Sequence, residues 1–152
     1  MSKLHRYASK ADLMNISIKY GEEKFKFNLY EELVINENNI NDELLVNPQS
    51  YGFLCMLHKK YARIKEDKDI ERNKAWSKVY IDYKNDLDPE TGKVYNNDMA
   101  KAHADVSEEY AKANKEYLDA LENLGILDTC VKSFEQRSFL MQTLSANLRK
   151  QS

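Results

Sequence analysis

The stretch KAWSKVYIDYKND combines cations and aromatic side chains at helical spacing. Trp76, Tyr80 and Tyr83 recur at i, i+4 and i+7, so a helix places their rings in one stripe. Lys74 and Lys78 form a neighbouring pair one helical turn apart. Binding of single-stranded nucleic acid without sequence preference uses rings that stack on bases beside cations that contact phosphates, at about 1–3 kcal/mol per stacked base. The spacing therefore indicates a surface for a polyanion.

Charge is segregated along the chain in blocks of opposite sign. Residues 50–84 carry a net charge of +4 and residues 85–128 carry −7, within a total of −2. A local basic patch is compatible with this total, because a polyanion meets one face of a protein and not its sum. A solvated helix face has the same composition, and an aromatic stripe also suits a buried core. Both alternatives stay open beside nucleic-acid binding.

Motifs for catalysis or nucleotide binding are absent from the sequence. It has no glycine-rich phosphate loop of the GxxxxGK[ST] or GxGxxG type. His5, His58 and His103 are far from one another and from the cysteines at any metal-ligand spacing. Cys55 and Cys130 lack CxxC partners and are interpreted as reduced core thiols. We therefore expect no enzymatic activity, no cofactor and no metal.

Length and composition predict a single, mainly α-helical domain. The chain has 152 residues, 42% of them apolar and 32% charged, with only four glycines and two prolines. Few turn-forming residues favour long helices packed as a bundle or coiled-coil-like assembly over a sandwich or barrel. No apolar run approaches the roughly 20 residues of a membrane span, and no signal-peptide core follows the N-terminus. A cytoplasmic protein is the simplest interpretation.

Residues 1–28 are expected to form an N-terminal extension that contains a β-hairpin. Apolar and polar residues alternate on both sides of a loop at Gly21, with Ile16 and Ile18 before it and Phe25 after it. An isolated hairpin is only marginally stable in water, so it must pack on its own helices or on another subunit.

Residues 29–152 are expected to form a helical domain. It opens with a short helix and an Asn-rich loop, and Pro48 then stands where a helix commonly begins. A long amphipathic helix is predicted over residues 49–84, because Leu54, Leu57, Tyr61 and Ile64 recur at spacings of three and four. Pro89, Gly92 and paired Asn and Asp residues predict a loop over residues 85–97.

Helices suited to oligomerisation are predicted over residues 98–150. Two interleaved series repeat every seven residues, as in a helix packed lengthwise on another helix: Met99, Val106, Ala113 and Ala120, and His103, Tyr110, Tyr117 and Leu124. After Gly125 the apolar pattern resumes, and the cations Lys132, Arg137, Arg149 and Lys150 flank it. The last helix is thus expected to be apolar on one side and cationic on the other.

The order of these elements, from LYEEL through ININDELLVNPQSYGFLCMLHKKYARI and KVYIDYKND to LGILDTCVKSFEQRSFLMQTL, resembles the UvsY-like recombination mediators of tailed phages. The resemblance covers roughly residues 29–145. Phe134, Arg137 and Phe139 supply an F-x-x-R-x-F pattern near its end. Where the family has two adjacent tyrosines and then a glycine, this chain has the sequence YKND.

The resemblance implies a non-catalytic helical subunit that forms a ring-like homo-oligomer through its C-terminal region. Such a mediator binds single-stranded DNA without sequence preference and helps load a phage strand-exchange recombinase onto DNA coated by single-strand DNA-binding protein. For a phage-encoded protein, this takes place in the host cytoplasm.

Two sets of residues follow from the resemblance together with the spacing. Lys78 matches the position of the family's binding lysine, whereas Trp76 is expected to pack on the helix. The predicted nucleic-acid contacts are Arg72, Lys74, Lys78, Tyr80, Tyr83 and Lys84. The predicted oligomer contacts are Leu127, Val131, Phe134, Met141, Leu144 and Leu148.

Two other functions are compatible with the sequence. In the first, the chain is a scaffolding or protein-interaction module whose helices bind another protein and whose lysines only confer solubility. In the second, it is a small inhibitor that mimics DNA through the acidic block at residues 85–128.

Overall fold

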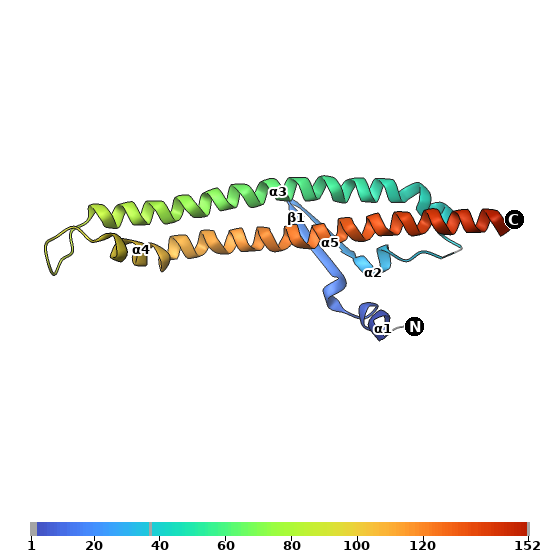
Figure 1. The fold of residues 1–152 in the computed structure, drawn as a ribbon, viewed down its shortest axis with the longest axis horizontal. Helices are drawn as coiled ribbons and strands as arrows, with labels where there is room; N and C mark the ends of the chain where they lie inside the picture. Colours follow the sequence, from blue (N-terminus) through green and yellow to red (C-terminus); the bar gives the residue numbers. More distant parts are fainter. Residues whose placement is uncertain (1–2, 37, 152) are drawn as a thin grey trace. The chain divides into compact units, whose positions relative to one another are not determined.

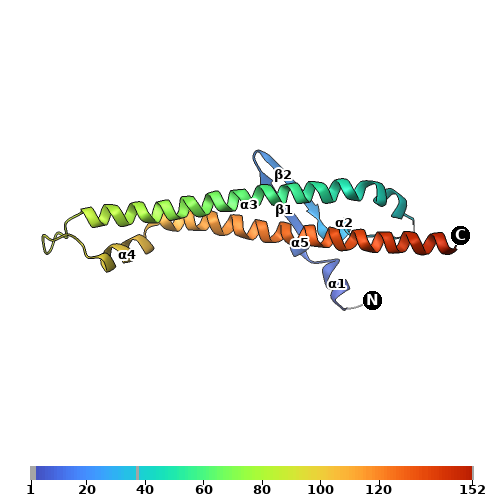
Figure 2. The same ribbon diagram turned by 45° about the horizontal axis from the view of Figure 1, so that its top comes forward.

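The computed structural model describes residues 3–36 and 38–151, which fall into two compact units. Unit 1 consists of Met1–His58 and Gly125–Ser152, and unit 2 of Lys59–Leu124. The elements in chain order are α1 (Lys3–Ala8), a 3-10 turn η1 (Asp12–Met14), β1 (Asn15–Tyr20), β2 (Glu23–Asn28), α2 (Leu29–Glu32), α3 (Ile40–Asn85), α4 (Asn97–Asp105) and α5 (Glu108–Gln151) (Figure 1). Both α3 and α5 contribute a segment to each unit, and within a unit the two segments lie side by side and antiparallel (Figure 2). The expected mainly α fold with an N-terminal hairpin is confirmed.

The hairpin forms as its alternation predicts. Strands β1 and β2 pair antiparallel, with Ile16 opposite Phe27 and Ile18 opposite Phe25. Gly21 takes a φ of +62° in the two-residue turn, a conformation that glycine adopts without steric cost. Ile18 is fully buried, and the ring of Phe25 packs edge-on against Phe53 of α3 at a centroid distance of 5.1 Å. The hairpin therefore packs on the chain's own helix within unit 1.

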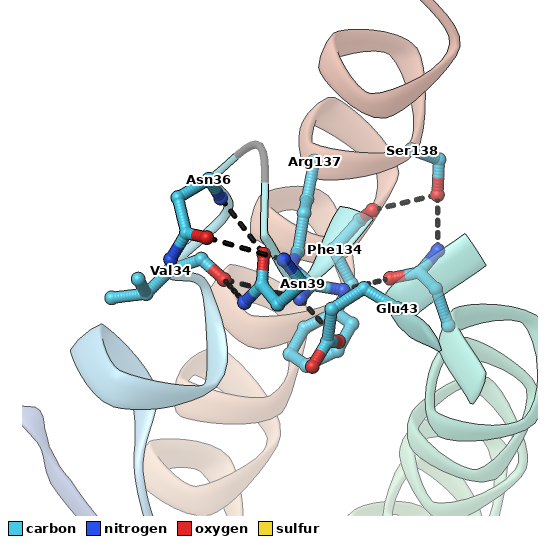
Figure 3. Close-up of polar contacts among 8 residues, drawn as sticks. Val34, Asn36, Asn39, Glu43, Phe134, Arg137 and Ser138 are labelled. Carbon is cyan, nitrogen blue, oxygen red and sulfur yellow. Dashed lines mark hydrogen bonds and ion pairs between the residues drawn. The ribbon is translucent and has the colours of Figure 1, made fainter. Parts of the chain in front are cut away.

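Helix α3 begins at Ile40, so the predicted start at residue 49 is wrong. The expected short helix (α2) and Asn-rich loop precede it, with residues 33–36 and 38–39 outside any helix, and the asparagines of this loop also cap α3. The side chain of Asn36 accepts a hydrogen bond from the backbone N–H of Asn39, and the side chain of Asn39 accepts one from the N–H of Asn36 (Figure 3). This reciprocal pair satisfies two N–H groups that a helix start leaves without partners.

Pro48 lies inside α3 rather than at its beginning. A proline within a helix has no N–H to donate, and its ring presses on the preceding turn, so helices bend at such positions. The first turns of α3 are bent relative to the rest of the helix (Figures 1 and 2). The cap ahead of Pro48 and the polar contacts of these turns with α5, described below, offset that cost.

The loop between α3 and α4 matches its prediction closely. Leu87 and Val94 form an isolated antiparallel bridge, and Gly92 takes a φ of +65°. The Asp88 carboxylate accepts hydrogen bonds from the Glu90 N–H and the Thr91 hydroxyl, at 2.9 and 2.8 Å. These bonds lower the pKa of Asp88 below its ordinary value. The loop is thus a tight turn closed by its own side chains.

The predicted heptad seam is interrupted in unit 2. Helix α4 ends at Asp105, and α5 starts at Glu108 with Ser107 as its cap, because the Ser107 hydroxyl accepts from the Tyr110 N–H. Val106 falls in this break and is 79% exposed, so its predicted place in the seam is wrong. Ala100 and Ala104, one turn apart on α4, are the fully buried residues there.

Replacing Gly125 with alanine is expected to stabilise the chain by about 1 kcal/mol, because glycine inside a helix costs roughly that amount relative to alanine. Gly125 is helical, and an added Cβ meets no atom within 4 Å. The free energy of unfolding in urea measures the effect. The control, Gly21→Ala in the hairpin turn, is expected to destabilise because of its positive φ. A Gly125→Ala variant that is less stable than the parent contradicts the expectation.

Candidate nucleic-acid interface

Lys74 and Lys78 lie on an open hollow on the exposed face of α3 in unit 2. The hollow has a volume of about 550 Å³ and is lined by Ile70, Asn73, Lys74, Ser77, Lys78, Ile81 and Asp82. Helical periodicity places these residues on one face, since they recur at intervals of three and four. Ile70 and Ile81 are 50% and 53% exposed at its two ends. Our sequence interpretation omitted these isoleucines, although their spacing from the lysines already placed them in the same stripe.

The two lysines of the hollow differ electrostatically from four other cations of α3. Among the residues that the structure describes, neither Lys74 nor Lys78 forms an ion pair. Four other cations of this helix are paired with acids: Arg63 with Asp67, Lys65 with Glu66, Lys68 with Glu71 and Glu116, and Arg72 with Asp69. The positive charge of the hollow is reduced only by Asp82 on its lining. It is thus available to a phosphate group.

The rings of Trp76 and Tyr80 face α4 instead of the hollow. They stack on each other with centroids 5.3 Å apart and an interplanar angle of 7°. The Trp76 indole N–H donates to the Asp105 carboxylate at 2.8 Å, and the Tyr80 hydroxyl donates to the Asn97 side chain at 3.4 Å. The expected packing role of Trp76 fits this position, whereas Tyr80 is half-buried in a contact between helices.

Tyr83 and Lys84 also lie in contacts within unit 2. The Tyr83 ring stacks on His103 with a centroid distance of 4.0 Å, and Tyr95 packs edge-on against both rings. The Lys84 ammonium group donates to the backbone carbonyl of Tyr95 at 3.1 Å. Both side chains hold the loop and α4 against the end of α3. His103 covers one face of the Tyr83 ring, so a nucleic-acid base can stack on that face only by displacing His103.

Arg72 packs against α5. Its guanidinium group lies over the Tyr117 ring, 3.9 Å from the centroid, where cation–π attraction is favourable. It also donates to Asn114 at 3.3 Å and pairs with Asp69. The structure therefore brings Lys74 and Lys78 together on an open surface. It places the other four predicted contacts in packing between elements of unit 2.

Lys68 connects α3 to α5 through two carboxylates. Its ammonium group lies 2.8 Å from Glu116 and 2.7 Å from Glu71. The hydrogen bonds that Lys68 donates, first to Glu116 and then to Glu71, raise the pKa of Lys68 to about 12. The same contact with Lys68 lowers the pKa of Glu116.

Glu116→Gln is expected to flatten the pH dependence of unfolding on the acid side. The folded-state pKa of Glu116 is lowered, so its carboxylate stabilises the fold above the ordinary glutamate pKa, and this contribution is lost as the pH falls through the folded value. Urea midpoints measured at neutral and acid pH test this, with the exposed Glu122→Gln as the control. Equal loss of stability in acid for Glu116→Gln and the parent contradicts it.

Arg137 is buried in unit 1, so its predicted place on a cationic face of α5 is wrong. Its side chain is 3% exposed and donates to Glu43 at 2.5 Å and to Asn47 at 2.7 Å, both on the first turns of α3 (Figure 3). A weaker bond at 3.5 Å reaches the carbonyl of Val34. Asn47 donates in turn to Ser138 at 2.8 Å. These hydrogen bonds hold the N-terminal turns of α3 against α5.

Half of the predicted oligomer contacts are core residues of unit 1. Leu127, Phe134 and Met141 are at most 3% exposed within this single chain. Val131, Leu144 and Leu148 are half-buried. In contrast, Phe139 and Leu140 are 64% and 60% exposed on α5. The heptad spacing of the buried residues serves packing within the subunit, and the exposed pair is the better candidate for a contact outside it.

The cysteines and histidines offer no assembled chemical site in the described part of the chain. Burial raises the pKa of the Cys130 thiol to about 11, and Cys55 is half-buried and also free. Among residues 3–36 and 38–151, no group of three His, Cys, Asp or Glu side chains is arranged to hold a metal. None of the helices formed by these residues has the length and apolar character needed to cross a membrane.

Comparison with known proteins adds no assignment to this geometry. No protein-family model, curated protein or solved structure matches the chain. The hollow on α3 and the charges around it therefore carry the functional argument.

Proposed function

We propose that the chain is a UvsY-like recombination mediator. It binds single-stranded DNA without sequence preference and promotes loading of a phage strand-exchange recombinase onto DNA coated by single-strand DNA-binding protein. The observation that supports the DNA-binding step is the pair Lys74 and Lys78, one turn apart, exposed and without an ion pair among the described residues. Both cations remain free to contact successive phosphates of one strand.

The apolar part of the hollow supports a single strand over a duplex. Ile70 and Ile81 extend the lysine pair with exposed apolar surface, on which unpaired bases lose contact with water. A duplex keeps its bases stacked inside and gains nothing from such surface.

The mediator step rests on many weak contacts acting together. A single lysine pair binds weakly, so the mediator acts as a ring-like homo-oligomer in which several hollows engage one strand at high effective concentration. Loading of the recombinase then requires that the oligomer binds DNA in the recombinase-competent state better than in the state covered by the competing binding protein.

The proposal is tested by titrating a labelled oligonucleotide of mixed sequence across a salt series, with the oligomer mass followed by light scattering. We expect binding to single strands that weakens steeply with salt, with a logarithmic slope of roughly −0.7 per phosphate contacted. Weaker binding to a duplex of the same length is also expected. Affinity that is unchanged between low and moderate salt contradicts a phosphate-binding surface.

Lys74→Ala combined with Lys78→Ala is expected to reduce the salt slope by roughly 1.4 for each hollow engaged, because two phosphate contacts are removed. Affinity falls uniformly for all sequences, whereas the urea midpoint stays unchanged since both side chains are exposed. Lys112→Ala with Lys115→Ala on α5 removes the same charge from the same unit and is the matched control. Equal losses of affinity in both double variants show that the hollow is not the site.

The non-catalytic interaction module is the second candidate function. It is favoured by the packing of Tyr83 and Lys84 inside unit 2, because these side chains are then not free to bind DNA. In this case the hollow binds a helix of a partner protein through Ile70 and Ile81. Absence of binding to both single- and double-stranded DNA at low salt distinguishes this function from the mediator.

A further inference from the structure

An open apolar groove lies on unit 1 where β2, α2, α3 and α5 meet. It has a volume of about 350 Å³ and is lined by Phe27, Glu32, Val46, Gln49, Ser50, Phe53, Leu54 and Phe134. Val46 and Phe53 are still 47% and 46% exposed there. Large apolar side chains are thus left uncovered on a surface that also has a concave shape.

The groove has an acidic rim. Glu32 is part of its lining, and Glu31 precedes it on α2. Asp42 lies one helical turn before Val46, so both side chains share a face of α3. Within the described residues, none of these three acids forms an ion pair. An occupant with apolar anchors and positive charge fits this surface.

The N-terminal helix α1 has the complementary character. Leu4 and Tyr7, at i and i+3 on one face, are 78% and 71% exposed, and α1 has no buried residue. Lys3, Arg6 and Lys10 lie next to this face in sequence and are exposed. The segment therefore combines an uncovered apolar face with three cations.

The chain holds its own α1 away from the groove by a different contact. The imidazole Nε2 of His5 lies 3.1 Å from the Tyr30 hydroxyl, and the two rings have centroids 5.5 Å apart. Neither His5 nor Tyr30 lines the groove. With α1 attached here, Leu4 and Tyr7 face solvent, and the groove of the same chain stays open.

We propose that α1 of a second copy of this chain binds in the groove. Leu4 and Tyr7 of one copy pack on the apolar floor formed by Phe53 and its neighbours. The cations of α1 face the acidic rim, and this charge complementarity selects α1 over other apolar segments. Because each copy carries both surfaces, a reciprocal exchange closes as a dimer and a one-way contact continues to the next copy.

This contact is separate from the proposed DNA-binding function. Both surfaces belong to unit 1, whereas the hollow with Lys74 and Lys78 belongs to unit 2. Residues 1–28, which include α1, also lie outside the part of the chain that resembles the mediators. Self-association is therefore measured in the absence of DNA, and Lys74→Ala with Lys78→Ala, which leaves both surfaces of unit 1 unchanged, is expected to retain it.

The test uses an arm variant, Leu4→Ser with Tyr7→Ser, and a groove variant, Phe53→Ser, each in the full chain. Sedimentation velocity over a concentration series is expected to show self-association at least about tenfold weaker for either variant, as for the loss of large apolar anchors at an interface. When the two are mixed, one intact arm and one intact groove remain, so differently tagged copies are expected to capture each other. Val106→Ser, which removes an apolar side chain that is 79% exposed in unit 2, is the matched control.

Exchanging the charges of α1 and the acidic rim provides a second test, which does not depend on whether the groove variant Phe53→Ser still folds. Lys3→Glu with Arg6→Glu is expected to weaken self-association, and adding Glu32→Lys and Asp42→Lys in the same chain is expected to restore it. Unchanged association of the arm variant overturns the proposal. Weaker self-association of the groove variant alone, with unchanged association of the arm variant, indicates another occupant of the groove and also overturns the proposal. If the arm variant lowers the free energy of unfolding equally at all protein concentrations, α1 binds the groove of its own chain, and the proposal is overturned as well.

Discussion

Replacing Glu43 with alanine is expected to destabilise the chain by about 3 kcal/mol. The change leaves the Arg137 guanidinium group, 3% exposed, without the carboxylate that lies 2.5 Å from it. Glu43 itself is 34% exposed, but its removal leaves the buried Arg137 charge without a counter-charge in a medium of low dielectric constant, which is the costly case. The free energy of unfolding in urea measures the loss.

A second substitution separates the charge from the packing. Arg137→Met in the Glu43→Ala background removes the orphaned charge and keeps an apolar side chain of similar length, so stability is expected to recover in part. Breaking the exposed pair of Lys132 and Asp128 with Lys132→Ala is the control and is expected to change stability by less than about 1 kcal/mol. If the double variant is no more stable than Glu43→Ala alone, the buried charge is not the cause.

Leu127→Ala is expected to destabilise by about 2–5 kcal/mol because it opens a cavity in the core of unit 1. Leu127 is fully buried, whereas Leu140 on the same helix is 60% exposed. Leu140→Ala is therefore the matched control, with an expected effect within about 0.5 kcal/mol on the folding of one subunit. Unfolding in urea at low protein concentration compares the two.

The same pair distinguishes a core residue from an oligomer contact. A contact between subunits gives a loss of stability that grows with protein concentration, since association adds to the folding free energy. The loss for Leu127→Ala is expected to be the same at every concentration. A loss of stability that grows with protein concentration contradicts the burial of Leu127 within one subunit and indicates that Leu127 contacts another subunit.

Sequence patterns predicted correctly the elements whose structure is determined by residues close in sequence. Alternation of Ile16 and Ile18 with polar residues gave the hairpin, and Pro89 and Gly92 gave the loop. The spacing of Leu54, Leu57 and Tyr61 identified the buried face of α3, where each is at most 5% exposed. In these segments, periodicity and turn chemistry agree with the fold, so no distant residue was needed to find them.

Competing local signals explain the errors at helix boundaries. Pro48 is a strong marker of a helix start, but the side-chain cap of Asn36 and Asn39 placed the start further upstream. The second error concerns Val106, which fits the heptad spacing in the sequence but lies in the break between α4 and α5. Ser107 starts a new helix there, because its hydroxyl accepts a hydrogen bond from the Tyr110 N–H and so caps α5.

The candidate site was predictable only in its exposed part. The one-turn spacing of Lys74 and Lys78 is a property of α3 alone, and the structure places both on the hollow. Tyr83 and Lys84 find partners on α4 and in the loop, at His103 and Tyr95, which spacing within one helix cannot reveal. Arg137 is the same case in unit 1, because its partner Glu43 is 94 residues away in sequence.

The division of the chain into units sets an order for folding during synthesis. Unit 2 is one continuous segment, Lys59–Leu124, and its helices can pair as soon as that segment leaves the ribosome. Unit 1 consists of the two ends of the sequence. The polar side chains of the first turns of α3 therefore gain their hydrogen bonds to Arg137 only after α5 has been synthesised. We expect unit 2 to resist protease in stalled nascent chains from which Leu124 has left the ribosome, while the segment around Glu43 becomes resistant only after all of α5 has emerged.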